Sequence, residues 1–153
     1  MVFRSLCTVG LISLLGTAAT SADDKALAAE LKKAEGTWEV ASALRNGEAM
    51  TKTEREAFRL VVKNGAYEYQ VDGKVVEKGK VKFVGMEKEF LFIDLTPADG
   101  MNKGKTFKGL FEWLGEDGAR VTLPLKPLAG RLIMAGGEKG TGQALYIYKR
   151  VKE

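Results

Sequence analysis

Apolar and polar residues alternate in short segments along most of the chain after residue 36, and turn-forming residues separate many of these segments. An alternation with a period of two is typical of a β-strand with one buried face and one solvent-exposed face. We therefore predict an all-β fold, a single eight-stranded antiparallel up-and-down barrel with a short N-terminal helix. The expected strands cover residues 37–45, 58–63, 66–71, 75–84, 89–95, 106–114, 119–123 and 143–151.

Pairs of an Asn or Asp with a Gly mark the expected turns between the early strands. These pairs are Asn46-Gly47, Asn64-Gly65 and Asp72-Gly73. At Asn64-Gly65, between two runs of alternating apolar residues, the pair predicts a type I′ hairpin, because both residues tolerate positive φ. Consecutive strands joined in this way indicate a meander, which is the connectivity of an up-and-down barrel.

Two short helices are expected outside the strands. Asp23 and Asp24 predict a helix that continues through Lys33 and lies across one end of the barrel. Thr53 is followed three residues later by Glu56, which predicts a capping box for one helical turn before the second strand.

The sequence is compatible with two structures for residues 124–141. Residues 131–135 could form an additional strand, or they could belong to a loop that crosses one mouth of the barrel. The glycines at 136, 137 and 140 indicate mobility in this segment.

Alternation also predicts which side chains face the barrel interior. On the first strand it places Trp38, Val40, Ser42 and Leu44 on one side, and Glu39 and Arg45 on the other. Aromatic residues dominate the inward positions of the later strands and are the candidate ligand-binding residues. They are Tyr67, Tyr69, Phe83, Phe107, Phe111 and Trp113. Small barrels either hold one ligand or are filled by their own side chains, so both alternatives stay open here.

The N-terminus has the layout of a secretory signal. Arg4 precedes an apolar run over residues 6–15, and small residues follow over 16–22. We predict cleavage before Asp23, which gives a signal peptide at 1–22, a barrel domain at 23–153, and export to the periplasm or the extracellular space. A membrane anchor is the alternative, but the apolar run is shorter than the roughly 20 residues that span a bilayer, so we expect no membrane span after cleavage.

Composition excludes several kinds of chemistry. The chain has no histidine, its one cysteine is Cys7 in the predicted signal, and Ser42 is the single serine after residue 22. Catalytic triads and zinc sites therefore lack their usual residues. We expect no enzyme activity, no catalytic residues, no metal site and no cofactor.

One carboxylate remains a candidate for acid–base chemistry. Asp94 lies between apolar residues, which would desolvate its side chain. The favoured interpretation is structural: Asp94 ends its strand and hydrogen-bonds into the turn at Thr96.

The net charge of +4 is mild, and the basic residues do not cluster on one face with aromatic residues. Lys78, Lys80 and Lys82 alternate with smaller or apolar residues, as on the solvent face of a strand. We therefore expect no nucleic-acid binding.

Several short motifs resemble known families. Gly36-Thr37-Trp38 together with Arg150 resembles the lipocalin pattern, in which the arginine stacks across the tryptophan and closes the barrel base. More of the chain resembles a family of exported, lipocalin-like bacterial domains of the planctomycete type, which has no established activity. The motifs that carry this second resemblance are Gly36-Thr37-Trp38, residues 72–76, 93–97 and 102–106, Gly142-Gln143 and Lys149-Arg150. It implies the barrel fold, an exported location and closure by Gly36, Trp38 and Arg150; residues 131–137 depart from the family pattern.

Two functions are compatible with these features. The first is an exported, non-enzymatic, lipocalin-like barrel that binds a small apolar or amphipathic ligand in its interior. The alternative is a solid-cored interaction module that docks an envelope protein or an acidic polymer through its exterior or the 124–141 loop.

Overall fold

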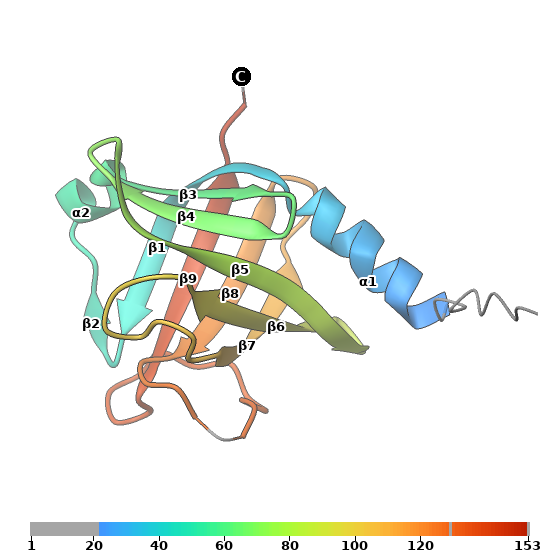
Figure 1. Ribbon diagram of the computed structural model, residues 1–153. Coiled ribbons are helices and arrows are strands. Elements are labelled where there is room, and N and C mark those ends of the chain that lie inside the picture. Colours follow the sequence, from blue (N-terminus) through green and yellow to red (C-terminus); the bar gives the residue numbers. More distant parts are fainter. Residues whose placement is uncertain (1–21, 129, 153) are drawn as a thin grey trace, which may run out of the picture.

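Eight antiparallel strands form a closed barrel in the computed structural model, which describes residues 22–128 and 130–152 (Figure 1). Each strand pairs with its neighbours along the chain, and pairing between the first and the last barrel strand closes the sheet. The predicted all-β class and up-and-down barrel are therefore confirmed. The barrel strands are β1 (Gly36–Arg45), β3 (Phe58–Lys63), β4 (Ala66–Val71), β5 (Lys74–Glu87), β6 (Phe90–Pro97), β7 (Phe107–Trp113), β8 (Gly118–Pro124) and β9 (Gln143–Arg150).

The long connection between β1 and β3 carries two short elements. The strand β2 (Glu48–Ala49) pairs with the end of β1 outside the barrel and was not predicted, because two residues give no periodic signal. The helix α2 (Lys52–Ala57) was predicted, but its capping box is formed by Thr51 and Glu54 and not by Thr53 and Glu56. Both threonines have a glutamate three residues later, so the sequence pattern alone is ambiguous.

The predicted turns have the backbone conformation that their residues favour. Asn64 and Gly65 have φ values of 51° and 71°, which confirms the type I′ hairpin between β3 and β4. The turn at Asp72-Gly73 repeats this geometry between β4 and β5.

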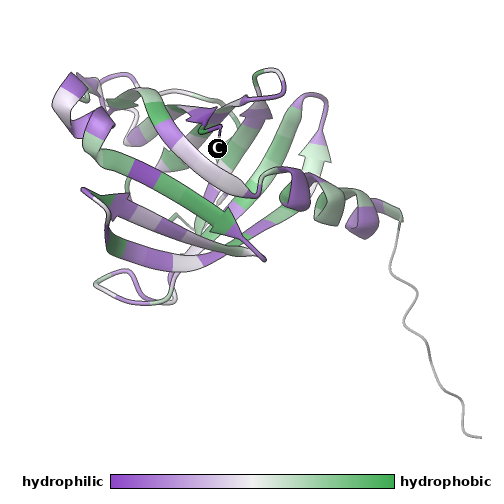
Figure 2. Ribbon diagram, turned by 90° about the horizontal axis from the view of Figure 1, so that it is seen from above, coloured by the Kyte–Doolittle hydropathy of each residue, from purple (hydrophilic) through white to green (hydrophobic). Residues whose placement is uncertain are grey.

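Side chains alternate between the core and the solvent along the barrel strands. The hydropathy of the residues changes accordingly along the ribbons in Figure 2. On β6, for example, Leu91, Ile93 and Leu95 are buried and face the interior, while Asp94 faces outward. The buried residues of all eight strands form one core cluster inside the barrel.

A β-bulge in β1 changes which side chains point inward. Val40 pairs with Tyr148 on β9, but the next pairs are Ser42 with Ile147 and Ala43 with Tyr146. The extra residue reverses the alternation, so Ala43 is buried and Arg45 shares its side of the sheet. The predicted alternation of β1 is therefore wrong after Val40: Ser42 and Leu44 face outward, and Arg45 faces inward.

One end of the barrel, here named the closed end, is covered by α1 (Ala22–Lys33). Leu27 and Leu31 pack against the core, and Ala34, which follows the helix, is buried. The helix was predicted to lie across this end, but only its last turns pack there and the first turns project away from the barrel (Figure 1). Residues 1–21 of the predicted signal peptide lie outside the described residues.

Arg150 joins β9, β1 and the end of α1 at the closed end. Its guanidinium carbon lies 4.2 Å from the centroid of the Trp38 ring. The same guanidinium donates hydrogen bonds to the carbonyl oxygens of Lys33 and Glu35, at 2.7 and 2.5 Å. A side chain at Gly36 would approach this guanidinium to 2.8 Å, which explains the glycine. The contact expected from the Gly36, Trp38 and Arg150 motif is present.

The connection between β8 and β9 runs across the outer wall of the barrel; we name residues 125–142 the outer strap. Leu132 and Gly137 are buried against the wall, and a methyl group on Gly137 would touch the outward-facing Leu145 and the backbone of Leu44. The side-chain oxygen of Asn46 accepts hydrogen bonds from the backbone amides of Gly140 and Gly142 in the strap. Residues 131–135 are thus neither an added strand nor a loop that crosses the mouth of the barrel. Mobility was predicted from the glycines of this segment, but Gly137 is buried and packed against the wall.

Candidate functional site

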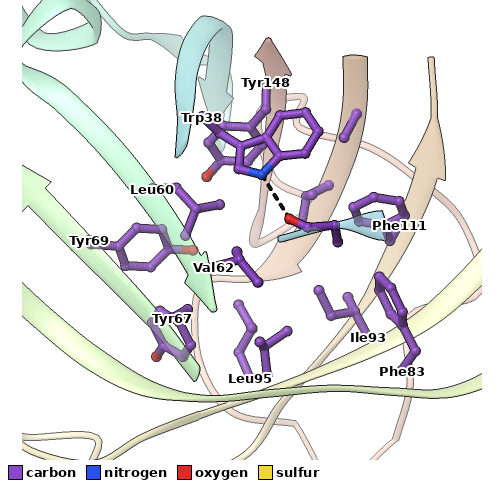
Figure 3. Close-up of a pocket in the computed structure, with 14 residues that line it drawn as sticks. Trp38, Leu60, Val62, Tyr67, Tyr69, Phe83, Ile93, Leu95, Phe111 and Tyr148 are labelled. Carbon is purple, nitrogen blue, oxygen red and sulfur yellow. Dashed lines mark hydrogen bonds between the residues drawn. The ribbon is translucent and has the colours of Figure 1, made fainter. Parts of the chain in front are cut away.

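An apolar cavity of about 40 Å³ lies inside the barrel, and we name it the inner cavity (Figure 3). All eight barrel strands contribute to its wall. An apolar cavity of about 150 Å³ can bind benzene, so the inner cavity is too small for an aromatic ring. Aromatic side chains take up much of the space, since Phe83 and Phe111 meet edge to face with their centroids 5.0 Å apart. The barrel interior is therefore largely filled.

A wider pocket of about 180 Å³ lies at the end opposite α1, and we name it the mouth pocket. It shares Tyr67, Tyr69 and Leu95 with the inner cavity, so the two spaces adjoin. The closed end is covered and the mouth is not, so a ligand has access from the mouth side. The mouth pocket is lined by Arg45, Tyr67, Tyr69, Glu77, Leu95, Asn102, Phe107, Leu123, Pro124, Leu125, Ala144 and Tyr146.

The six aromatic residues predicted from the sequence are divided between three places. Tyr67 and Tyr69 line both spaces, while Phe83 and Phe111 line only the inner cavity. Phe107 lines the mouth pocket.

Trp113 lines neither space and lies under α1 at the closed end. Its indole nitrogen donates a hydrogen bond to Glu30 at 2.6 Å, and the Lys33 ammonium lies 4.2 Å from its ring centroid. Its role in the structure is to hold the helix against the barrel.

Four tyrosines contribute hydroxyl groups to this region. Burial raises the pKa of Tyr69, Tyr146 and Tyr148, so these phenols remain protonated at neutral pH and can donate hydrogen bonds. Burial also raises the pKa of Tyr67, and its hydrogen bond to the Glu77 carboxylate, at 2.8 Å, adds to that shift. The rings of Tyr146 and Tyr148 stack with their centroids 5.7 Å apart, which aligns both on the β9 side of the interior.

Two oppositely charged groups face the mouth pocket from different strands. Arg45 comes from the end of β1 and Glu77 from near the beginning of β5. Within the described part of the chain, no carboxylate lies within 4.0 Å of the Arg45 guanidinium. Arg45 therefore brings to the pocket a positive charge without an ion pair within 4.0 Å, although it attracts the Glu54 carboxylate and helps to lower its pKa. Glu77 already accepts a hydrogen bond from Tyr67.

Asp94 lies outside both spaces, on the outer wall. Its carboxylate pairs with the Arg131 guanidinium, which also donates hydrogen bonds to the carbonyl oxygens of Ile93 and Gly109, both at 3.2 Å. The structural interpretation predicted a hydrogen bond into the Thr96 turn, but the Asp94 partner described by the structure is Arg131. Asp94 thus anchors the outer strap to β6 and β7.

Comparison of the chain with protein-family models, curated proteins and solved structures found no match. Across residues 22–128 and 130–152, no helix is long and apolar enough to cross a membrane. The same residues contain no group of three histidine, cysteine, aspartate or glutamate side chains placed to hold a metal ion.

The sequence analysis missed three residues of the mouth region, namely Arg45, Glu77 and Tyr146, and one residue of the inner cavity, Tyr148. The sequence did contain a signal that Tyr146 and Tyr148 face inward. They alternate along β9 in phase with Arg150, and the resemblance placed Arg150 on the Trp38 ring. Arg45 was assigned to the outer face because the sequence did not reveal the β1 bulge.

Proposed function

We propose that this protein is an exported, non-enzymatic, lipocalin-like barrel that binds a small apolar or amphipathic molecule. One observation carries the proposal: an apolar inner cavity adjoins a wider pocket with polar groups at the open end, while the other end is covered. Binding sites for small molecules combine an apolar lining with a few placed polar groups. The two volumes support a ligand whose body lies in the mouth pocket, with only a methyl-sized group in the inner cavity.

Ligand-observed NMR with benzyl alcohol, a neutral molecule with one ring, tests this function. Ala144 faces the mouth pocket and is buried, so Ala144→Phe should fill the pocket and abolish saturation transfer to benzyl alcohol. Ala66→Phe is the matched control, because Ala66 is an exposed strand residue with its side chain outside the barrel. Binding that is equal in both variants, or absent from the unmodified protein, would refute the proposal.

A second candidate function is protein docking through the outer strap. Ile133 and Met134 are 91% and 73% exposed, and they follow the buried Leu132, which holds them against the wall. Exposed neighbouring apolar residues are typical of contact sites. Replacing both with serine should abolish capture of an envelope protein and leave benzyl alcohol binding unchanged; unchanged capture would exclude this role.

A further inference from the structure

Hydrogen-bond donors line one wall of the open half of the barrel. Arg45 pairs with Ala144, Ala43 with Tyr146, and Val40 with Tyr148, so Arg45 and the two tyrosines occupy successive levels from the mouth inward. Tyr69 reaches the same region from β4 and lines both the inner cavity and the mouth pocket (Figure 3). The wall therefore offers a guanidinium and the hydroxyls of Tyr69 and Tyr146 to a ligand in the mouth pocket, with Tyr148 behind them.

The Tyr148 hydroxyl lies behind this wall, next to Tyr69. Tyr148 is 2% exposed, and its hydroxyl has no hydrogen-bond partner in the structure. The Tyr69 hydroxyl is its neighbour, and an interaction between the two hydroxyls contributes to the pKa shift of both phenols. A buried hydroxyl without a partner is unfavourable. The lone pairs of the Tyr69 oxygen can accept from Tyr148, which leaves the Tyr69 O–H to donate to a ligand.

Glu77, the cross-strand partner of Tyr69, limits the charge of the ligand. Glu77 faces the mouth pocket from β5 and is held by the Tyr67 hydroxyl. The negative charge of the Glu77 carboxylate repels a second anionic group on the ligand. One anionic group can lie against Arg45, while the rest of the ligand must be neutral.

We propose that the mouth pocket selects a small monocarboxylic acid, with its carboxylate bound by Arg45 and Tyr69. This inference rests on the proposed function and adds the charge and size of the ligand to it. The carboxylate accepts hydrogen bonds from the guanidinium and the phenol, and Tyr148 donates to Tyr69 behind it. The apolar body lies against Leu95, Phe107 and Leu123, in a space that fits about one ring.

Isothermal titration calorimetry with three probes of similar shape tests the inference. Benzoate carries one carboxylate, benzyl alcohol carries none, and terephthalate carries two. Benzoate should bind about tenfold more tightly than benzyl alcohol, because charge-assisted hydrogen bonds are stronger than neutral ones. Terephthalate should bind more weakly than benzoate, since its second carboxylate would approach Glu77.

Three variants locate the carboxylate. Arg45→Gln and Tyr69→Phe should each weaken benzoate binding about tenfold, and weaken it more than they weaken benzyl alcohol binding. Lys82→Gln is the control for lost charge, because Lys82 is an exposed residue on the outer face of β5, and it should change neither affinity. Near-UV circular dichroism checks that each variant is folded.

The outcomes separate the inference from the function on which it rests. If benzyl alcohol binds as tightly as benzoate, or if Arg45→Gln and Lys82→Gln have the same effect, the acid selectivity is refuted and the binding barrel is not. If neither probe binds, both proposals are refuted.

Discussion

Arg150→Met removes the charge at the closed end and keeps a side chain of similar length. The variant loses two charge-assisted hydrogen bonds, to the carbonyl oxygens of Lys33 and Glu35, and the attraction between the guanidinium and the Trp38 ring. Such hydrogen bonds contribute about 1.5–3 kcal/mol each, and a cation over an aromatic ring adds about 0.5–2 kcal/mol. Because part of the guanidinium is solvated and these contributions are not additive, we expect a loss of about 2–4 kcal/mol in the free energy of unfolding.

Urea unfolding followed by tryptophan fluorescence measures this loss directly. Trp38 and Trp113 lie at the closed end with ring centroids 6.2 Å apart, so their emission reports on the region that the variant changes. Arg150→Lys should lose only about 1–2 kcal/mol, because an ammonium keeps the attraction to the ring but cannot form the planar fork. Lys149→Met, at the exposed neighbouring position, should change stability by less than about 0.5 kcal/mol.

The order of the three variants decides whether the reasoning is right. If Arg150→Met unfolds at the same urea concentration as Lys149→Met, the closed-end contacts contribute no stability. If Arg150→Lys is as stable as the unmodified protein, the two carbonyl hydrogen bonds do not depend on the guanidinium fork.

Three further predictions concern other parts of the barrel. Burial raises the pKa of Tyr69, so the folded state holds its proton while the unfolded chain ionises above about pH 10. The free energy of unfolding should therefore be constant up to about pH 9 and then fall. Urea unfolding at about pH 8 to 11 should show a smaller fall in Tyr69→Phe, by up to about 1.4 kcal/mol per pH unit. A methyl group on Gly109 would overlap the backbone of β8, so Gly109→Ala should lower the free energy of unfolding by about 1–3 kcal/mol, whereas Gly130→Ala meets no atom and should be neutral by thermal unfolding. Asp94→Asn weakens the ion pair that anchors the outer strap, so limited proteolysis should cut residues 125–137 faster than in the unmodified protein. The free energy of unfolding should change by less than about 1 kcal/mol. Equal cutting rates would contradict this role of Asp94.

Local chemistry explains why so much of the barrel was predictable. Asn64-Gly65 and Asp72-Gly73 need nothing beyond their own backbone preferences to form tight turns, and the structure gives them the expected positive φ. The alternation of β6 is regular because one face is buried along its whole length, so the strand itself was predicted from the sequence.

The errors arise where contacts distant in sequence decide the structure. The β1 bulge is set by pairing with β9, and no residue near Ala41 indicates it, so Arg45 was placed on the wrong face. Leu132 is buried only because the outer strap lies along the barrel wall, which periodicity within the strap cannot show. For the candidate site, the main quantity that the sequence does not give is the volume of the interior. Alternation identifies the inward aromatic residues, but it cannot distinguish a filled interior from a hollow one.

The seam between β1 and β9 has a consequence for how the chain acquires its structure. Glu35 and Arg150, which meet at this seam, are 115 positions apart, so the sheet stays open until the last strand is available. Contacts between such distant segments slow folding, because a long loop must close before they form. A chain shortened before β9 would keep the edges of β1 and β8 unpaired, and exposed strand edges promote aggregation. Removing β9 should therefore yield insoluble protein in place of a smaller soluble barrel.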